Sequence, residues 1–157
     1  MEKGRVTLRF LAEPTDVNFG GKVHGGQVMR WIDQAGYSCA LGWSSTYSVT
    51  AYVSGIQFKR PLHIGDMVEV AARIIHTGNT SMHFAVDVYG EPLKGGDKEH
   101  TCHCVIVFVA IDEAGNTVSV PRFEPKTDED RGLQAYAKDL MSMREEIASK
   151  MESRAKI

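Results

Sequence analysis

The chain has 157 residues, of which 43% are hydrophobic and 24% charged, and its formal net charge at pH 7 is -2. This composition is that of one globular domain and excludes a disordered or fibrous chain, and the small net charge provides no field that attracts nucleic acid without sequence specificity. The apolar runs are too short to cross a bilayer and the first ten residues lack the apolar core of a signal peptide, so we expect a cytoplasmic protein that binds neither nucleic acid nor membrane.

The first predicted element is a strand over Arg5–Leu11, where apolar and polar residues alternate. Residues 14–21 are rich in Pro, Asp, Asn and Gly, which is typical of a loop. From residue 24 to residue 41, apolar side chains recur at steps of three and four, which predicts an amphipathic helix. Asp33 falls beside the apolar stripe of this helix rather than opposite it, so we expect its carboxylate to be partly buried.

Residues 48–60 predict the next strand, but their apolar side chains change from odd to even positions near Gly55. Such a change of parity predicts a β-bulge, which re-aims side chains and often lies near a site. A simple bend that wraps the sheet explains the pattern equally well, and the sequence leaves both explanations open.

The middle of the chain predicts three more strands. Residues 67–76 and 80–89 alternate on either side of a short polar turn, which indicates a hairpin. Residues 101–111 are apolar on nearly every position, as expected of a central strand.

The last predicted element is an amphipathic helix over residues 128–156, whose thin apolar stripe can pack on its own domain or on a neighbouring subunit. The order of elements favours an α+β fold in which the first long helix covers one face of a mainly antiparallel sheet. Pairing of two sheets edge to edge would protect the exposed strand, so a dimer is the expected unit. We expect one domain over residues 5–122 and a helical extension over residues 123–157.

Several motifs, in order and at matching spacing, carry a resemblance to a known family over residues 5–121. The chain resembles the hotdog-fold acyl-CoA hydrolases. The resemblance implies a long central helix wrapped by an antiparallel sheet, a sheet continuous across a homodimer, further assembly into a tetramer or hexamer, and hydrolysis of acyl-coenzyme A without a cofactor beyond the coenzyme A of the substrate. The motifs are Pro14-Thr15-Asp16-Val17-Asn18, Gly21, His24-Gly25-Gly26, Met29, Asp33, Ala35-Gly36, Phe58-Lys59-Arg60-Pro61, Ile64-Gly65-Asp66 and Thr77-Gly78-Asn79-Thr80-Ser81.

The resemblance implies that Asp33 is the catalytic carboxylate and that Asn18 is a second group of the active site. Thioester chemistry agrees, because a carboxylate can activate water or attack the carbonyl itself, and donors must then stabilise the oxyanion. The amide of Asn18 and the backbone N–H groups of Gly25 and Gly26 at the helix start are suitable donors. The alternatives are a solvated helix carboxylate for Asp33 and a turn or capping role for Asn18.

The spacing along the helix limits this arrangement. Gly26 precedes Asp33 by seven residues, which corresponds to roughly 10 Å along the helix axis. One carbonyl carbon cannot lie within reach of both, since donor and base must each be about 3 Å from the reacting atoms. We therefore hypothesise that Asp33 of one subunit works with the segment 18–26 of the other.

The substrate-binding candidates follow the same motifs. His24 is expected to line the site rather than act as an acid or base, and Met29 is expected to line an acyl tunnel together with Ile32, Phe58 and Phe84. Phosphate contacts are expected from cationic and turn residues, with Lys94, Lys98 and Arg122 as secondary candidates. The principal candidates are Lys59, Arg60, Gly78, Asn79, Thr80 and Ser81.

A metal site is the rival chemistry, because His100, Cys102, His103 and Cys104 lie close in sequence. On a strand, the two cysteines share one face and His103 points to the other, so the four side chains cannot converge and no metal is expected. The three cysteines cannot all pair within the chain, so we expect reduced thiols, with the cysteines serving as small core residues.

Two other functions compete with hydrolysis. A hotdog protein can bind acyl-CoA without cleaving it, because a fold does not fix a function. A hydratase of enoyl-CoA would need an Asp and His pair, but Asp33 lies nine residues after His24, so the two cannot pair within one helix. The preferred acyl chain, the choice between water attack and a covalent anhydride, and the role of the last helix stay open.

Overall fold

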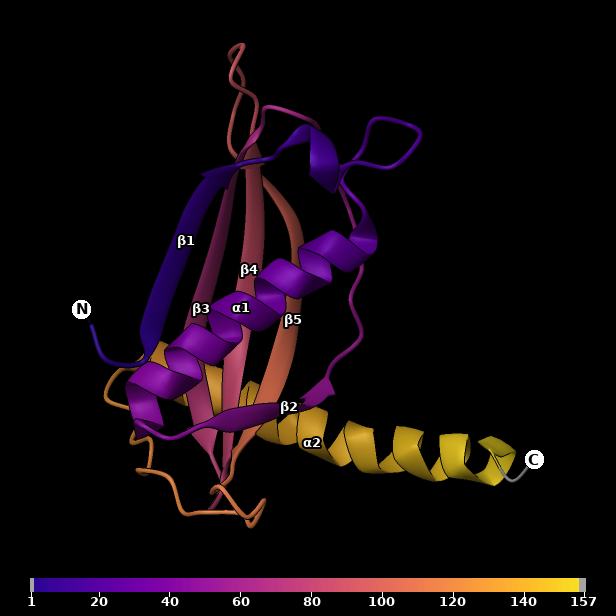
Figure 1. Cartoon of the computed structure of the whole chain (residues 1–157). Coiled ribbons are helices and arrows are strands. Elements are labelled where there is room, and N and C mark those ends of the chain that lie inside the picture. The colour runs from indigo at the N-terminus through magenta and orange to yellow at the C-terminus, as the bar shows by residue number, and fades with distance from the viewer. Residues whose placement is uncertain (1, 156–157) are drawn as a thin grey trace.

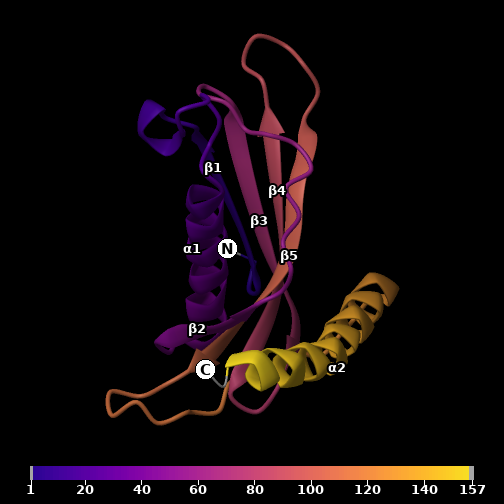
Figure 2. The same ribbon diagram turned by 90° about the vertical axis from the view of Figure 1, so that its right-hand side faces the viewer.

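The computed structural model describes residues 2–155, which form a five-stranded antiparallel sheet with one long helix on each face (Figures 1 and 2). The strand order is β1-β3-β4-β5-β2, so the two edges are β1 and β2. The predicted α+β class is confirmed, and the last residue of the predicted second helix, Lys156, lies outside the described residues. The elements are β1 (Arg5–Leu11), a short 3-10 turn (Pro14–Asp16), α1 (Gly25–Ser44), β2 (Ser48–Val53), β3 (Met67–Thr77), β4 (Ser81–Glu91), β5 (Glu99–Ala110) and α2 (Asp128–Ala155).

The helix α1 lies across the inner face of the sheet (Figure 1), and its apolar stripe, which includes Val28, Ile32 and Ala35, is fully buried. Close approach of helix and sheet depends on Gly36, because a Cβ atom there would lie 2.8 Å from the ring of Phe108. Tight packing of this kind is what fixes the position of α1 on the sheet. In the part of the chain described here, neither helix is apolar enough over a sufficient length to span a membrane.

The prediction for residues 48–60 was wrong in two respects. The strand β2 ends at Val53, and the irregularity in its pairing with β5 falls between Thr50 and Tyr52, not beside Gly55. After Val53 the backbone keeps only isolated bonds to β5, from Ser54 N to Val105 O and from Lys59 N to Thr101 O. The parity change in the sequence therefore marks the departure of the chain from the sheet rather than the bulge itself.

The helix α2 packs with its first half on the outer face of the same sheet (Figure 2). Ala137 is buried among Ile75, Ala85 and Val105. The start of the helix is held by Arg73, whose guanidinium lies 2.6 Å from the carboxylate of Asp130. The sequence left open whether this helix packs on its own domain or on a neighbouring subunit. The first half of the helix packs on its own domain.

The cysteines and His103 lie on opposite faces of β5. Cys102 and Cys104 are free thiols in the core, and burial raises their pKa values to about 11 and about 12. His103 faces outward, where its Nδ1 lies 2.9 Å from Asp87 and its Nε2 lies 3.1 Å from the hydroxyl of Tyr136. This histidine therefore links the outer face of the sheet to α2.

His83 on β4 is buried beneath α2, with 3% of its surface exposed. Burial lowers its pKa to about 4, and the nearby charges of His76 and Arg144 act in the same direction. Because the folded protein prefers the neutral ring, protonation favours the unfolded chain. The contribution of His83 to stability is therefore present above pH 6.5 and is lost as the pH falls towards 4.

We expect the variant His83→Phe to lose less stability between pH 7 and pH 4 than the wild type, by about 3 kcal/mol, the equivalent of the shift in pKa. Urea unfolding followed by circular dichroism at both pH values measures the difference. The control is His24→Phe, which replaces an exposed histidine at the start of α1. Equal acid sensitivity of wild type and His83→Phe would contradict the assignment.

Candidate active site

Asn18 lies in the loop before α1, which a backbone bridge between Val17 and Val23 closes. The side-chain carbonyl Oδ1 of Asn18 accepts bonds from the N–H of Gly20 at 2.9 Å and of Lys22 at 3.3 Å. These bonds fix the amide plane, and within residues 2–155 the NH₂ group of Asn18 makes no described hydrogen bond, so it can donate to a ligand. The structure therefore shows the turn role of Asn18, and its role as a donor in the active site stays a prediction.

The first turn of α1 offers two further donors. The N-cap residue His24 makes no side-chain cap bond, and its carbonyl accepts from the N–H groups of Gln27 and Val28. Among residues 2–155, the N–H groups of Gly25 and Gly26 have no acceptor, and the space around the Cα of Gly26 is open. Free N–H groups at the positive end of a helix form an anion site, since they favour developing negative charge.

Asp33 lies on the third turn of α1 and is half-buried, as predicted. Its Oδ1 accepts a hydrogen bond of 2.5 Å from the hydroxyl of Thr50 on β2. A short bond from a neutral hydroxyl holds the carboxylate in one orientation and leaves its second oxygen free. The sequence pattern did not reveal Thr50 as a hydrogen-bond partner of Asp33, because only the pairing of β2 places it beside α1.

Asp33 and Thr50 lie at the open edge of the sheet. The strand β2 pairs with β5 on one side only, so within the described residues its other side has no strand partner. The donors Gly25 and Gly26 lie at the start of α1, roughly 10 Å from Asp33 along the helix axis. One chain therefore presents the carboxylate and the donors as two separated groups.

A groove of about 330 Å³ brings several of the predicted residues together beside the start of α1. Asn18 and Gly25 line it, and Phe58, half exposed, lies 3.5 Å from the position of a Cβ on Gly25. Lys59 and Arg60 line the same groove, although Arg60 also forms an exposed ion pair of 3.2 Å with Glu99. The predicted donors and the two cations therefore lie together at this end of the molecule.

The turn between β3 and β4 lies at the other end of the sheet (Figure 1). Gly78 and Asn79 line a second groove, of about 440 Å³, together with Arg122 and Lys138. Backbone groups of the turn already form hydrogen bonds within the chain. The N–H of Gly78 donates to the carbonyl of Ser81, and the N–H of Ala110 donates to the carbonyl of Thr80. Because the turn and the groove of Lys59 and Arg60 lie at opposite ends of the sheet, they do not meet within one chain.

The remaining candidates are placed individually. His24 is exposed at the helix start, and Met29, with 47% of its surface exposed, lies on the same helix. Lys98 is engaged by Glu69, with Nζ and Oε1 2.6 Å apart, and it lies over the ring of Tyr89. Lys98 is therefore less available for a phosphate group than Lys59.

Comparison with known families gives one match, to a model described as the thioesterase superfamily, over residues 20–95. Two relatives illustrate the similarity. Protein VdlD of Helicobacter pylori is 32% identical over 127 residues, covering 81% of this chain and 72% of its own. Acyl-CoA thioester hydrolase YciA of Salmonella typhimurium is 32% identical over 124 residues, covering 76% of this chain and 92% of its own.

Solved structures share the fold. A hexameric acyl-CoA thioesterase, solved without ligand, superposes with a TM-score of 0.88 at 32% identity and covers 94% of both chains. An acyl-CoA hydrolase from Bacillus cereus superposes with a TM-score of 0.89 at 29% identity, covering 96% of this chain and 92% of its own. A hexameric thioesterase from Yersinia pestis covers only 73% of this chain, at 32% identity and a TM-score of 0.69.

Proposed function

Because the chain belongs to the hotdog-fold acyl-CoA hydrolases of the thioesterase superfamily, we propose that it hydrolyses acyl-CoA to a free acid and coenzyme A with Asp33 as the catalytic carboxylate. The observation that carries the residue assignment is the bond of 2.5 Å from Thr50 to Asp33 at the open edge of the sheet. It holds one carboxylate oxygen and leaves the other to act on water or on the thioester carbonyl.

The donors for the oxyanion come from the segment before and at the start of α1. When the carbonyl carbon becomes tetrahedral, its oxygen gains negative charge and needs preorganised donors. The NH₂ group of Asn18 and the N–H groups of Gly25 and Gly26 meet this need, because their positions are fixed by the loop and helix backbone. Collapse of the intermediate then expels the thiolate of coenzyme A, which takes up a proton.

A complete site requires two chains in this proposal. The carboxylate lies at the free edge of β2, and the donors lie roughly 10 Å away along α1, too far for one thioester. Antiparallel pairing of β2 with β2 of a second copy brings two α1 helices side by side. Asp33 of one copy then faces the donor segment of the other, and each dimer contains two sites.

The phosphates of coenzyme A are proposed to contact Lys59 and Arg60, which line the groove that contains Asn18 and Gly25. The turn Gly78 to Ser81, with Arg122, is a second phosphate-binding candidate and would come from another copy in the assembly. The hexameric relatives make such an assembly the expected one. The proposed chemistry uses no metal or cofactor beyond the coenzyme A of the substrate.

The direct test is release of free thiol from a panel of acyl-CoA esters of different chain length, measured with a thiol reagent. We expect steady turnover of at least one ester that persists in the presence of a chelator. Acyl esters of N-acetylcysteamine, which lack the phosphates, should be cleaved with a higher KM, and the variant Lys59→Ala should raise KM only for the CoA esters. Binding of acyl-CoA without any thiol release would establish a non-catalytic binding protein instead.

Thr50 is expected to position Asp33 rather than touch the substrate. Replacing it with valine removes the hydroxyl at similar volume and should lower kcat roughly 10-fold, with little change in KM. Thr50→Ser, which keeps the hydroxyl, should retain most of the activity. If Thr50→Val and Thr50→Ser are equally active, the hydrogen bond has no role in catalysis.

A further inference from the structure

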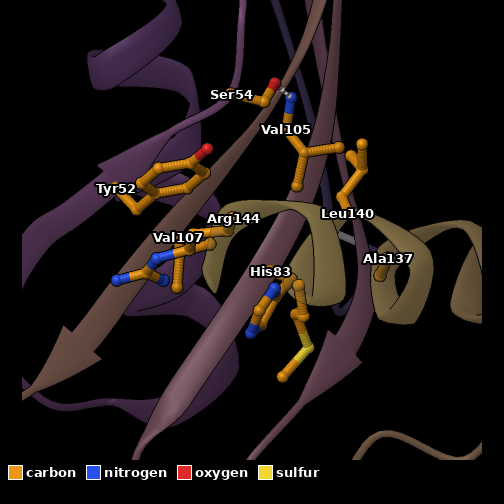
Figure 3. Close-up of a pocket in the computed structure, with 9 residues that line it drawn as sticks. Tyr52, Ser54, His83, Val105, Val107, Ala137, Leu140 and Arg144 are labelled. Atoms are coloured by element: carbon orange, nitrogen blue, oxygen red, sulfur yellow. Dashed lines mark hydrogen bonds between the residues drawn. The ribbon is translucent and has the colours of Figure 1, made fainter. Parts of the chain in front are cut away.

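The helix α2 crosses the outer face of the sheet from β3 to the free edge at β2. Asp130 pairs with Arg73 of β3, Ala137 packs on Ala85 and Val105, and the guanidinium of Arg144 lies 4.3 Å from the ring centre of Tyr52 on β2. Figure 3 shows Arg144 reaching from α2 to Tyr52 at the mouth of the small pocket between helix and sheet. Within residues 2–155, Arg144 is thus the last residue along α2 that contacts the sheet of its own chain.

The helix continues from Arg144 to Ala155, and its C-terminal end extends beyond the sheet (Figure 1). Every residue from Glu145 to Ala155 is exposed. We refer to residues 145–155 as the overhang. Its eleven residues span about 16 Å along the helix axis, which equals roughly three strand spacings.

The overhang continues the apolar stripe that packs on the sheet. Leu133, Ala137, Leu140, Ile147 and Met151 follow one another at helical spacing and lie on one side of α2. The first three lie in the interface with the sheet, whereas Ile147 is 49% exposed and Met151 is 66% exposed. The overhang therefore points an apolar side towards the plane in which the sheet would continue.

A matching apolar surface exists on the sheet itself. Val49 of β2 pairs with Val109 of β5, and both point to the outer face, opposite to Thr50 and Phe108. Both valines are only partly buried, because α2 covers Val105 and Val107 of the same strand but does not extend to this end of β5. The two valines form a half-exposed patch beside the free edge.

We propose that the overhang of each chain docks on the patch of Val49 and Val109 of a second copy, across a seam made by two β2 strands. The inference rests on the two-chain site proposed above and adds a second contact to it. Antiparallel pairing that uses all of Ser48–Val53 puts Tyr52 opposite Val49 of the second copy. The helix that passes over Tyr52 then continues over Val49 and its neighbour Val109 in that copy.

The contact is reciprocal, because a two-fold axis through the seam gives each copy both an overhang and a patch. The two overhangs run in opposite directions, each on the outer face of the other chain. The active-site side of the sheet carries α1, so the overhangs hold the dimer together from the face opposite to catalysis. Arg144, which contacts Tyr52 at the seam, separates the part of α2 that packs on its own chain from the part that packs on its partner.

The test is the dimer dissociation constant of the full chain, measured by sedimentation equilibrium. The double variant Ile147→Asp/Met151→Asp places charge on the docked side and should raise the dissociation constant at least roughly 100-fold. Ser149→Asp, on the opposite side of the same helix, is the matched control and should leave the constant unchanged. Val49→Asp should weaken the dimer in the same way as the double variant.

Two results would overturn the proposal. Equal dissociation constants for the double variant, Ser149→Asp and wild type would show that the overhang carries no contact between the paired copies. Intact dimers that lose only a larger assembly would assign the overhang to a third copy instead. Because the measurement is of assembly, a wild type that dimerises but fails to cleave thioesters would contradict the proposed function and leave this inference standing.

Discussion

Replacing Asp33 with alanine should lower kcat for thioester hydrolysis by about 10³-fold, while KM and the folded structure change little. The carboxylate is the one group in the proposed site that can deprotonate water or attack the carbonyl, and its loss leaves only the oxyanion donors. The side chain is half-buried and bonded to Thr50, so its removal costs the helix no core packing. Single-turnover and steady-state thiol release with the best ester of the panel measure the effect.

The matched control is Gln34→Ala, one residue further along α1 and exposed on the polar side of the helix. It should retain wild-type activity and should have the same circular dichroism spectrum and unfolding midpoint as Asp33→Ala. Asp33→Asn, which keeps the size and a hydrogen-bond acceptor for Thr50, separates charge from shape. If Asp33→Ala turns over at the wild-type rate, another group is the base and the assignment fails.

Mixing two inactive chains should restore activity if the site is shared. Asp33→Ala chains retain Asn18, and Asn18→Ala chains retain Asp33, so a mixed dimer contains one site in which both groups are intact. Random exchange between equal amounts makes half of the dimers mixed, with one working site of two, which predicts recovery of about one quarter of wild-type activity. Thiol release after unfolding the mixture and refolding it together gives the recovered fraction.

Two controls accompany the mixing experiment. Each inactive chain taken through the same cycle alone should stay inactive, and wild type should recover fully. A chain carrying both Asp33→Ala and Asn18→Ala, mixed with Asp33→Ala, provides no intact site and should show no recovery. Absence of recovery in the test mixture, with mixed dimers verified by mass, would place Asp33 and Asn18 of one site in the same chain.

The sequence was sufficient for the family and for the elements with long, regular periodicity. Motif order predicted the hotdog-fold acyl-CoA hydrolases, which the comparisons confirm. The step pattern of α1 placed Asp33 beside the buried stripe, where it is found half-buried. Periodicity predicts such helices because a helix that packs on a sheet must bury one continuous side. The apolar residues of that side recur at regular steps within one short stretch of sequence.

The edge strand was the least predictable element, since its limits depend on pairing rather than on composition. Ile56 and Phe58 continue an alternating pattern after Val53, yet the regular ladder with β5 ends at Val53 and only isolated backbone bonds follow. Thr50 was missed for the same reason: nothing in its neighbourhood distinguishes it from other strand threonines. Only the packing of β2 against α1 brings its hydroxyl to Asp33.

The extra residue in β2, Ala51, has a consequence for how relatives of this chain can diverge. Because it is skipped in the pairing with β5, Thr50 points inward to Asp33 while Tyr52 points outward to Arg144. Without it, residues two apart would point to the same face. Substitutions at this position should therefore be common among relatives, whereas insertions and deletions between residues 49 and 52 should be absent. A change of one residue in length would separate Asp33 from Thr50 or Arg144 from Tyr52.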